Sequence, residues 1–279
     1  MNGKNSGKNI IITGGASGIG KALGFLFAES GATVILFDIN KKGADDAAHE
    51  IAEESGRKVY SSQVNVSDFH AFKEAVDSVI HDIGPVDIFI NNAGIGVSGE
   101  LVNNSLEEIN HITDVNYLGM IYGSRIILPL FYNQGFGHLV NVASVAGLQG
   151  FPKMSLYCAA KAGIVAFTQA VCFEARRKGI NVSLALPSTT DTPMIMDNID
   201  EEDDTVPGIL MAIPMCRTED VAKAIFKGIN KRKFSIFPTL SDRGALFARS
   251  YFPGIFNLFI KSVGFKSFKA KREKLKKEC

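Results

Sequence analysis

Residues 9–20 read NIIITGGASGIG, an apolar run that passes directly into a turn rich in glycine. The run at residues 9–13 is almost continuously apolar, as a strand covered on both faces of a sheet must be. The glycines at positions 14, 18 and 20 allow a tight turn, and the helix that follows offers free N–H groups and a partial positive charge at its N-terminus. Any tight strand-to-helix turn can use glycine, so this motif needs support from the rest of the chain.

The chain continues this alternation of short apolar runs and helical patterns. Strands are predicted at residues 9–13, 33–37, 58–64, 86–90, 138–143, 180–186 and 234–237. Helices are predicted at residues 18–30, 41–55, 69–83, 106–133, 156–178 and 218–231. Strict alternation predicts an α/β fold, a Rossmann-like doubly wound parallel sheet of about seven strands with right-handed crossovers. We expect a single domain over residues 1–240 and a C-terminal extension over residues 241–279.

Composition and charge narrow the class of protein. Hydrophobic residues make up 46% of the 279, which is enough for a sizeable core and argues against disorder. The net charge of +1 hides a segregation, because residues 1–222 carry 15 Lys/Arg and 26 Asp/Glu, whereas residues 223–279 carry 15 and 3. The acidic body gives no hint of nucleic-acid binding. A polar N-terminus and four Cys without metal-pair spacing predict a cytoplasmic protein with reduced thiols and no metal site.

A carboxylate follows the second predicted strand. Asp38 lies 18 residues after Gly20, where it can accept hydrogen bonds from a ribose diol and repel a 2′-phosphate. Alone it could equally cap a helix, but together with the glycine turn it indicates a dinucleotide site. Ile39 follows it, and Lys41 and Lys42 come a turn later, at what looks like a solvated helix start. The sequence therefore favours NAD over NADP.

Three polar side chains suggest proton chemistry. Tyr157 and Lys161 are four residues apart on a predicted helix and so share one face. A phenol with a pKa of about 10 is a poor base, but a neighbouring ammonium favours the phenolate, so Tyr157 could exchange a proton with an alcohol or ketone. Ser144 ends the fifth strand, where α/β sheets place their ligands, and its hydroxyl could hold the substrate oxygen. Each residue alone is more often structural, but their joint occurrence favours a catalytic site.

The motifs together resemble the short-chain dehydrogenase/reductase family over about residues 8–240. The resemblance rests on TGGASGIG at 13–20, Asn91-Asn92-Ala93-Gly94, Asn116, Ser144 and YCAAK at 157–161, in order and spacing. It implies that Tyr157 is the acid/base and that Lys161 activates it and binds a ribose. It also implies that Ser144 orients the substrate and that Asn116 anchors a water-linked proton relay to Lys161.

The resemblance further implies the contacts of an NAD cofactor. The expected residues are Gly14, Ser17, Gly18, Ile19, Gly20, Asp38, Ile39, Asn65, Val66, Asn92, Ala93, Gly94, Tyr157, Lys161, Pro187, Thr190 and Thr192. The family usually has Asp where Asn65 stands, and an amide can still accept and donate hydrogen bonds. It usually has Gly at the position of Ser188 and Val at that of Thr190. Backbone contacts from Thr190 and Thr192 to the nicotinamide amide are still expected.

Two segments break the alternation. Residues 197–204 are strongly acidic and are read as a solvated loop or a lid. Four methionines flank them and are read as core filling or as an apolar wall for a substrate: Met194, Met196, Met211 and Met215. Residues 244–265 are apolar and aromatic and precede a basic run, but their uncharged stretch is shorter than the roughly 20 residues of a membrane span. This extension could lie on a membrane surface through residues 244–277, or pack on the body or a partner subunit.

We therefore expect an NAD-dependent oxidoreductase that interconverts a secondary alcohol and a ketone by hydride transfer. The expected substrate is an apolar small molecule of the steroid, retinoid, prostanoid or acyl type. The alternatives are a 3-oxoacyl or sugar reductase, and a dinucleotide-binding scaffold of low turnover. We also expect a homodimer or homotetramer, in the cytoplasm or associated with a membrane.

Overall fold

Seven strands form one parallel sheet in the computed structural model, which describes residues 3–96, 99–192, 194, 205–207, 215–239, 244, 251, 254, 258 and 265–267. They are β1 (Asn9–Thr13), β2 (Thr33–Asp38), β3 (Val59–Gln63), β4 (Ile88–Asn91), β5 (His138–Val142), β6 (Asn181–Ala185) and β8 (Ser235–Ile236). Their order is β3-β2-β1-β4-β5-β6-β8, and every pairing is parallel. The order reverses between β1 and β4, so a crevice for ligands is expected there. The predicted doubly wound sheet is confirmed.

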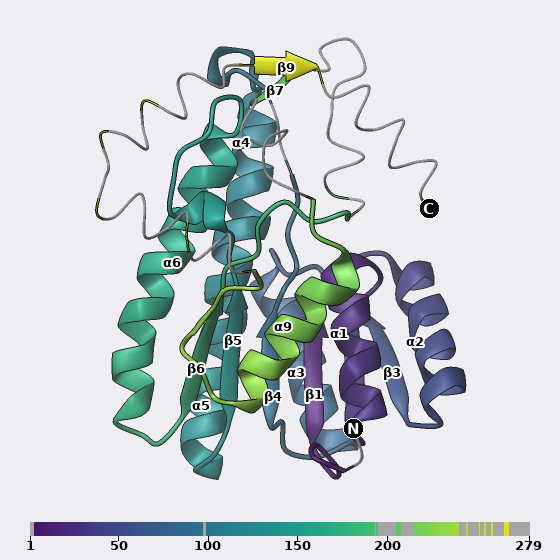
Figure 1. Ribbon diagram of the computed structural model, residues 1–279. Coiled ribbons are helices and arrows are strands. Elements are labelled where there is room, and N and C mark those ends of the chain that lie inside the picture. Colours follow the sequence, from purple (N-terminus) through teal and green to yellow (C-terminus); the bar gives the residue numbers. More distant parts are fainter. Residues whose placement is uncertain are drawn as a thin grey trace.

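Helices cover both faces of this sheet (Figure 1). One face carries α1 (Gly18–Glu29), α2 (Lys41–Ser55) and α9 (Thr218–Asn230), and the other carries α3 (Phe69–Asp82), α5 (Gly119–Gln134) and α6 (Ser155–Arg176). Alternate residues of β1 feed the two layers: Ile10 and Ile12 join the core under α1, whereas Ile11 joins the core under α3. Both faces of the strand are buried, which is why its sequence is apolar without alternation.

The predicted helix at 106–133 is interrupted. It divides into α4 (Leu106–Thr113), a π-helical turn η2 (Asp114–Leu118) and α5. Gly119 donates its N–H to Asp114 five residues earlier, so the turn holds one residue more than an α-helical turn. Hydrophobic periodicity cannot resolve a single added residue, so the sequence predicted one continuous helix. The π turn carries Asn116, which is fully buried.

A second, small sheet was not predicted. β7 (Thr205–Pro207) pairs antiparallel with β9 (Phe265–Ser267), which belongs to the C-terminal extension. Two further 3-10 turns, η1 (Leu101–Asn103) and η3 (Val145–Gly147), occur in the connections. The acidic stretch 197–204, Met196, Met211 and most of residues 241–279 lie outside the described residues. The division at residue 240 stays a prediction.

Among the described residues, α6 is the one helix long and apolar enough to cross a membrane by length and composition. Core helices of ordinary α/β proteins pass the same test. Ile164 and Val165 of α6 are buried against Leu184 of β6, so its apolar face belongs to the core.

Candidate active site

The glycine turn is shaped to receive an anion. Gly14 and Gly18 have φ of 66° and 52°, a region that side chains rarely adopt. A Cβ on Gly20 would lie 2.0 Å from the carbonyl oxygen of Gly14, so only glycine lets α1 start this close to the turn. Ser17 is the N-cap but makes no side-chain capping bond within the described residues, and the first turn of α1 has no acidic residue. The free N–H groups of the first turn of α1, including that of Ile19, therefore suit a pyrophosphate.

Asp38 ends β2 beside this turn. Its carboxylate accepts hydrogen bonds of 3.0 Å from the backbone N–H groups of Ala16 and Asn40. These bonds hold the carboxylate against the glycine turn, and its oxygens have further lone pairs for a ribose diol. Ile39 is 62% exposed directly after it, as a residue facing an adenine would be. Asp38 thus ends β2 beside the glycine turn, and its contact with a ribose stays a prediction.

The end of β4 is bonded to the same turn. The hydroxyl of Thr13 accepts from the N–H groups of Asn92 and Ala93, at 2.9 and 3.0 Å. The side-chain amide of Asn92 donates to the carbonyls of Thr13 and Gly14, at 3.0 and 3.2 Å. A Cβ on Gly14 would come within 2.9 Å of Ala93 Cα, so the two segments nearly touch. Thr13 was missed from the sequence, although a polar residue ending an apolar strand was a usable signal.

Asn65 and Val66 lie where β3 ends and the chain turns toward α3. Asn65 is exposed, and its side-chain oxygen accepts from both the N–H and the hydroxyl of Ser67, at 3.1 and 2.7 Å. Val66 is buried, and a Cβ on Gly119 would meet its side chain at 2.8 Å. The turn is therefore locally ordered, with the Asn65 amide nitrogen as the group suited to an adenine.

The proposed catalytic side chains converge where β5 ends. Ser144 accepts from the N–H of Ala146 at 3.1 Å and donates to the carbonyl of Pro187 at 3.3 Å, and its hydroxyl lies beside Tyr157. Lys161 lies one turn further along α6, 3% exposed, with its ammonium 5.7 Å from the Tyr157 ring centroid. The structure therefore brings together Ser144, Tyr157 and Lys161 from two elements, as the sequence predicted.

Burial changes the expected electrostatics of this group. The pKa of Tyr157 is raised to about 12, mainly by burial, and the hydrogen bond from Ser144 only partly offsets this. Burial likewise lowers the pKa of Lys161 to about 8. Burial is the largest influence on the pKa of Tyr157 here, and the lowering of that pKa by Lys161 stays a prediction. Tyr157 is a neutral phenol at physiological pH and is suited to donate a proton.

Three elements meet at Gly94. Asn116 bonds to Ile95 in both directions, accepting from its N–H and donating to its carbonyl, each at 2.7 Å. A Cβ on Gly94 would lie 3.0 Å from Asn116 Oδ1, 3.5 Å from Lys161 Nζ and 3.6 Å from Met194 Cε. A Cβ at this position would press on the Asn116 amide. The Asn116 side chain is engaged with Ile95, and its relay to Lys161 stays a prediction.

The segment after β6 is tied to α9. Thr190 forms a parallel bridge with Cys216, and Asp191 accepts from both the N–H and the hydroxyl of Thr218, at 2.6 and 2.7 Å. Ser188 is not among the non-glycine residues with positive φ in the described chain, so its turn does not need the glycine usual at that position. Thr190 is buried and the neighbouring Thr192 is half-buried. The Asp191–Thr218 pair was not found from the sequence.

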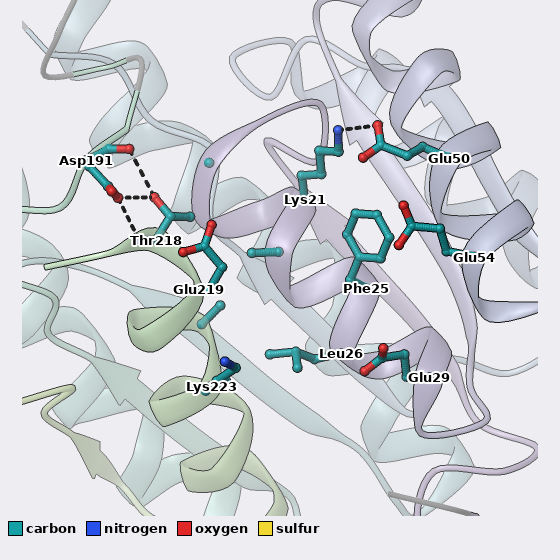
Figure 2. Close-up of a pocket in the computed structure, with 13 residues that line it drawn as sticks. Lys21, Phe25, Leu26, Glu29, Glu50, Glu54, Asp191, Thr218, Glu219 and Lys223 are labelled. Atoms are coloured by element: carbon teal, nitrogen blue, oxygen red, sulfur yellow. Dashed lines mark hydrogen bonds and ion pairs between the residues drawn. The ribbon is translucent and has the colours of Figure 1, made fainter. Parts of the chain in front are cut away.

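A groove of about 600 Å³ runs along the outer side of α1, between α2 and α9 (Figure 2). It starts at Gly18 and Asp191 and passes an ion pair of 2.6 Å between Lys21 and Glu50. Its carboxylates outnumber its ammonium groups, so it suits a dinucleotide phosphate poorly. The dinucleotide is therefore still expected at the glycine turn and the crevice at β1 and β4.

Fold and site together define an oxidoreductase that acts on an alcohol or ketone with a nicotinamide dinucleotide. The family model described as short chain dehydrogenase matches residues 8–203, and the chain belongs to this family. A 3-oxoacyl-[acyl-carrier-protein] reductase of Thermotoga maritima is 37% identical over 78% of this chain and 89% of its own length.

Solved structures agree with this assignment. A short-chain dehydrogenase/reductase from Burkholderia phymatum in complex with NAD has a TM-score of 0.80 and 26% identity, covering 88% of this chain and 94% of that one. A short-chain dehydrogenase from Sphingobium yanoikuyae in complex with NADPH has a TM-score of 0.76 and 26% identity, covering 87% and 93%. The dinucleotide class is thus supported, and the choice between NAD and NADP depends on this chain's own residues.

Proposed function

We propose that this protein reduces the ketone of a 3-oxoacyl-type substrate to a secondary alcohol, with NADH as the hydride donor. The observation that carries the proposal is the convergence of Ser144, Tyr157 and Lys161 at the end of β5, with the Lys161 ammonium 5.7 Å from the Tyr157 ring centroid and the phenol protonated at neutral pH. A neutral phenol beside a hydroxyl is arranged to give a proton to an oxygen that gains negative charge. Reduction of a ketone creates such an oxygen.

Each side chain has one task in this reaction. The Ser144 hydroxyl holds the ketone oxygen, and Tyr157 gives it a proton. The ammonium of Lys161 stabilises the phenolate that remains, which is why a cation belongs in this buried position. The dinucleotide, when bound, would supply the hydride, and the Lys161 ammonium would bind its ribose.

The preference for NADH is argued from the residues after β2. Asp38 places a carboxylate where a 2′-phosphate would be repelled. Lys41, the first cation after Asp38 in the sequence, has its ammonium 2.5 Å from the Asp45 carboxylate and is engaged in that ion pair. A 2′-phosphate would have to break this ion pair and approach Asp38.

We narrow the substrate from the broad apolar class expected from the sequence to the 3-oxoacyl type. The 37% identical reductase covers most of both chains, which supports the 3-oxoacyl alternative over a steroid or retinoid. The methyl group of Met194 near Lys161 supplies an apolar surface that an acyl chain could contact. Membrane contact through residues 244–277 gains no support and stays a prediction, as does the homodimer or homotetramer.

The test is loss of NADH absorbance with three ketones: a 3-oxoacyl N-acetylcysteamine thioester, cyclohexanone and a 2-keto sugar acid. We expect the thioester to give the highest kcat/KM. Tyr157→Phe should lower kcat by about a hundredfold or more while NADH binding, followed by fluorescence, is unchanged. Activity that survives Tyr157→Phe would reject the mechanism. NADH binding without turnover on any ketone would favour the scaffold alternative.

A further inference from the structure

A network of buried polar side chains lies in the core close to the catalytic centre. Its members come from four elements, Asn91 of β4, Asn141 of β5, Ser124 of α5 and Thr168 of α6, and each is at most 2% exposed. Asn91 and Asn141 are partners in the pairing of β4 with β5. Buried polar groups cost free energy unless they are hydrogen-bonded, so such a network is held in one arrangement.

The bonds of this network run in one direction. The Thr168 hydroxyl has a single proton, which it donates to the carbonyl of Ile164 at 2.7 Å, so it must accept from the Asn141 side-chain amide at 2.9 Å. The side-chain oxygen of Asn141 in turn accepts from the Asn91 amide at 2.9 Å. A reversed Asn141 amide would set two donors against each other. The chain of bonds therefore leads from the end of β4, through β5, to α6.

Thr168 and the catalytic lysine share one face of α6. Lys161 and Thr168 are seven residues apart, which is close to two helical turns. The Lys161 ammonium donates to the carbonyl of Val142 at 3.2 Å, and Val142 directly follows Asn141 in β5. Two successive residues of β5 therefore bond to α6, one through Lys161 and the other through Thr168.

These two bonds restrict a motion that apolar packing leaves freer. Ile164 and Val165 bury the middle of α6 among apolar side chains, and the hydrophobic effect has no preferred direction. Hydrogen bonds weaken steeply with angle, so two of them two turns apart oppose rotation of α6 about its axis. This rotation matters for catalysis, because Tyr157 and Lys161 belong to α6 whereas Ser144 follows β5. A misplacement of about 1 Å can lower a rate about a hundredfold.

We propose that Thr168 is a positioning residue for the reaction. Its hydroxyl, bonded to Asn141, keeps α6 in the rotation that places the Lys161 ammonium beside Tyr157. Thr168 is 0% exposed, so it touches neither the substrate nor the dinucleotide and acts through Lys161.

Ser124 provides a matched control within the same network. Its hydroxyl accepts from an asparagine amide, that of Asn91 at 3.2 Å, and donates to the carbonyl of Met120 four residues earlier, at 2.8 Å. Thr168 has the same two kinds of bond on α6. Ser124 belongs to α5, so the loss of its hydroxyl weakens the network without releasing the helix that carries Tyr157 and Lys161.

The test compares Thr168→Val with Ser124→Ala, each of which removes one hydroxyl and little volume. Both should lower the Tm by a few degrees, up to about 8 °C. Only Thr168→Val should lower kcat for the 3-oxoacyl N-acetylcysteamine thioester, by about tenfold or more, with KM changed less than about threefold. Thr168→Ser keeps the hydroxyl and should restore most of kcat. Equal kcat values in Thr168→Val and Ser124→Ala, or no rescue by Thr168→Ser, would overturn the proposal.

A second measurement asks whether Thr168 acts through Lys161. Thr168→Val should lower the Tm less in a Lys161→Met protein than in the parent, by at least about 2 °C, because the bond from Lys161 to Val142 is no longer there to be weakened. Ser124→Ala should lower the Tm equally in both. Equal losses from Thr168→Val in the two proteins would also overturn the proposal. If Thr168→Val does not fold, Thr168→Cys and Ser124→Cys replace the pair, and equal kcat values again count against it.

This inference rests on the proposed function for its kinetic readout, whereas the Tm comparison needs no turnover. If the parent protein reduces no ketone, the proposed function fails, and unequal Tm losses in the parent and the Lys161→Met protein still support the coupling of Thr168 to Lys161. If the parent and Thr168→Val reduce the thioester at the same kcat, the positioning role fails and the proposed function stands.

Discussion

Replacing the buried lysine of the active site should stabilise the protein while abolishing its activity. Lys161 is 3% exposed, and burial lowers its pKa from 10.5 to about 8. At pH 7 it is protonated in both the folded and the unfolded chain, so the folded state bears the cost of a buried charge. A pKa shift of this size corresponds to a loss of about 3 kcal/mol in the free energy of unfolding.

Lys161→Met removes that charge and keeps an unbranched apolar side chain of similar length. The Lys161 ammonium donates to the carbonyl of Val142 at 3.2 Å, and the loss of this bond offsets about 1–2 kcal/mol of the gain. The net expectation is a stabilisation of about 1–2 kcal/mol and a Tm higher by about 3–6 °C. The lysine is therefore expected to be required for activity although it lowers the stability of the fold.

The assay is chemical denaturation of both proteins at pH 7 and pH 9.5, with Lys178→Met, an exposed lysine just beyond α6, as the control. Between pH 8 and 10.5 the unfolded parent protein binds more protons than the folded one, so its stability relative to Lys161→Met rises with pH. The difference between the two proteins should therefore shrink at pH 9.5. A destabilised Lys161→Met protein at pH 7, or a difference that does not depend on pH, would refute the reasoning.

Three further changes test other parts of the structure. Asp38→Asn removes the charge that repels a 2′-phosphate, and the ratio of kcat/KM for NADH to that for NADPH should fall about tenfold or more; an unchanged ratio contradicts the ribose assignment. His138 is buried, and burial lowers its pKa from 6.5 to about 4. Its contribution to the free energy of unfolding, up to about 3 kcal/mol, is therefore present above pH 6.5 and is lost as the pH falls toward 4. Urea denaturation of His138→Gln at pH 7 and 4.5 should show a smaller loss than the parent protein, and an equal loss would reject this account. Gly20→Ala places a Cβ 2.0 Å from the Gly14 carbonyl and should weaken NADH binding about tenfold or more. The control is Gly150→Ala, whose Cβ meets nothing within 4 Å and which should not weaken binding. Equal NADH affinities of the two variants, measured by fluorescence quenching, would argue against binding of the dinucleotide at the glycine turn.

The local hydrophobic patterns of the sequence were sufficient to predict the parallel sheet. Each parallel strand is buried on both faces, so its apolar run is visible without knowing its neighbours. The glycine turn was also predictable, because its positive φ angles and the close start of α1 restrict Gly14, Gly18 and Gly20 individually. Resemblance to the family then identified Ser144, Tyr157 and Lys161, which the fold brings together.

Interactions between distant segments could not be predicted in the same way. The π turn that buries Asn116 against Ile95 differs from an α-helix by one residue. The bond between Asp191 and Thr218 joins residues 27 apart in the chain, with no periodic signal.

Sequence alone therefore determined the class of fold, the glycine turn and the candidate proton donor Tyr157, because these depend on residue type, short spacing and resemblance to the family. Only the tertiary structure decided the state of that donor. Burial in the folded chain raises the pKa of Tyr157 to about 12, and no short stretch of sequence specifies that burial. The same holds for β9 of the C-terminal extension, since its antiparallel pairing with β7 joins residues about sixty apart in the chain.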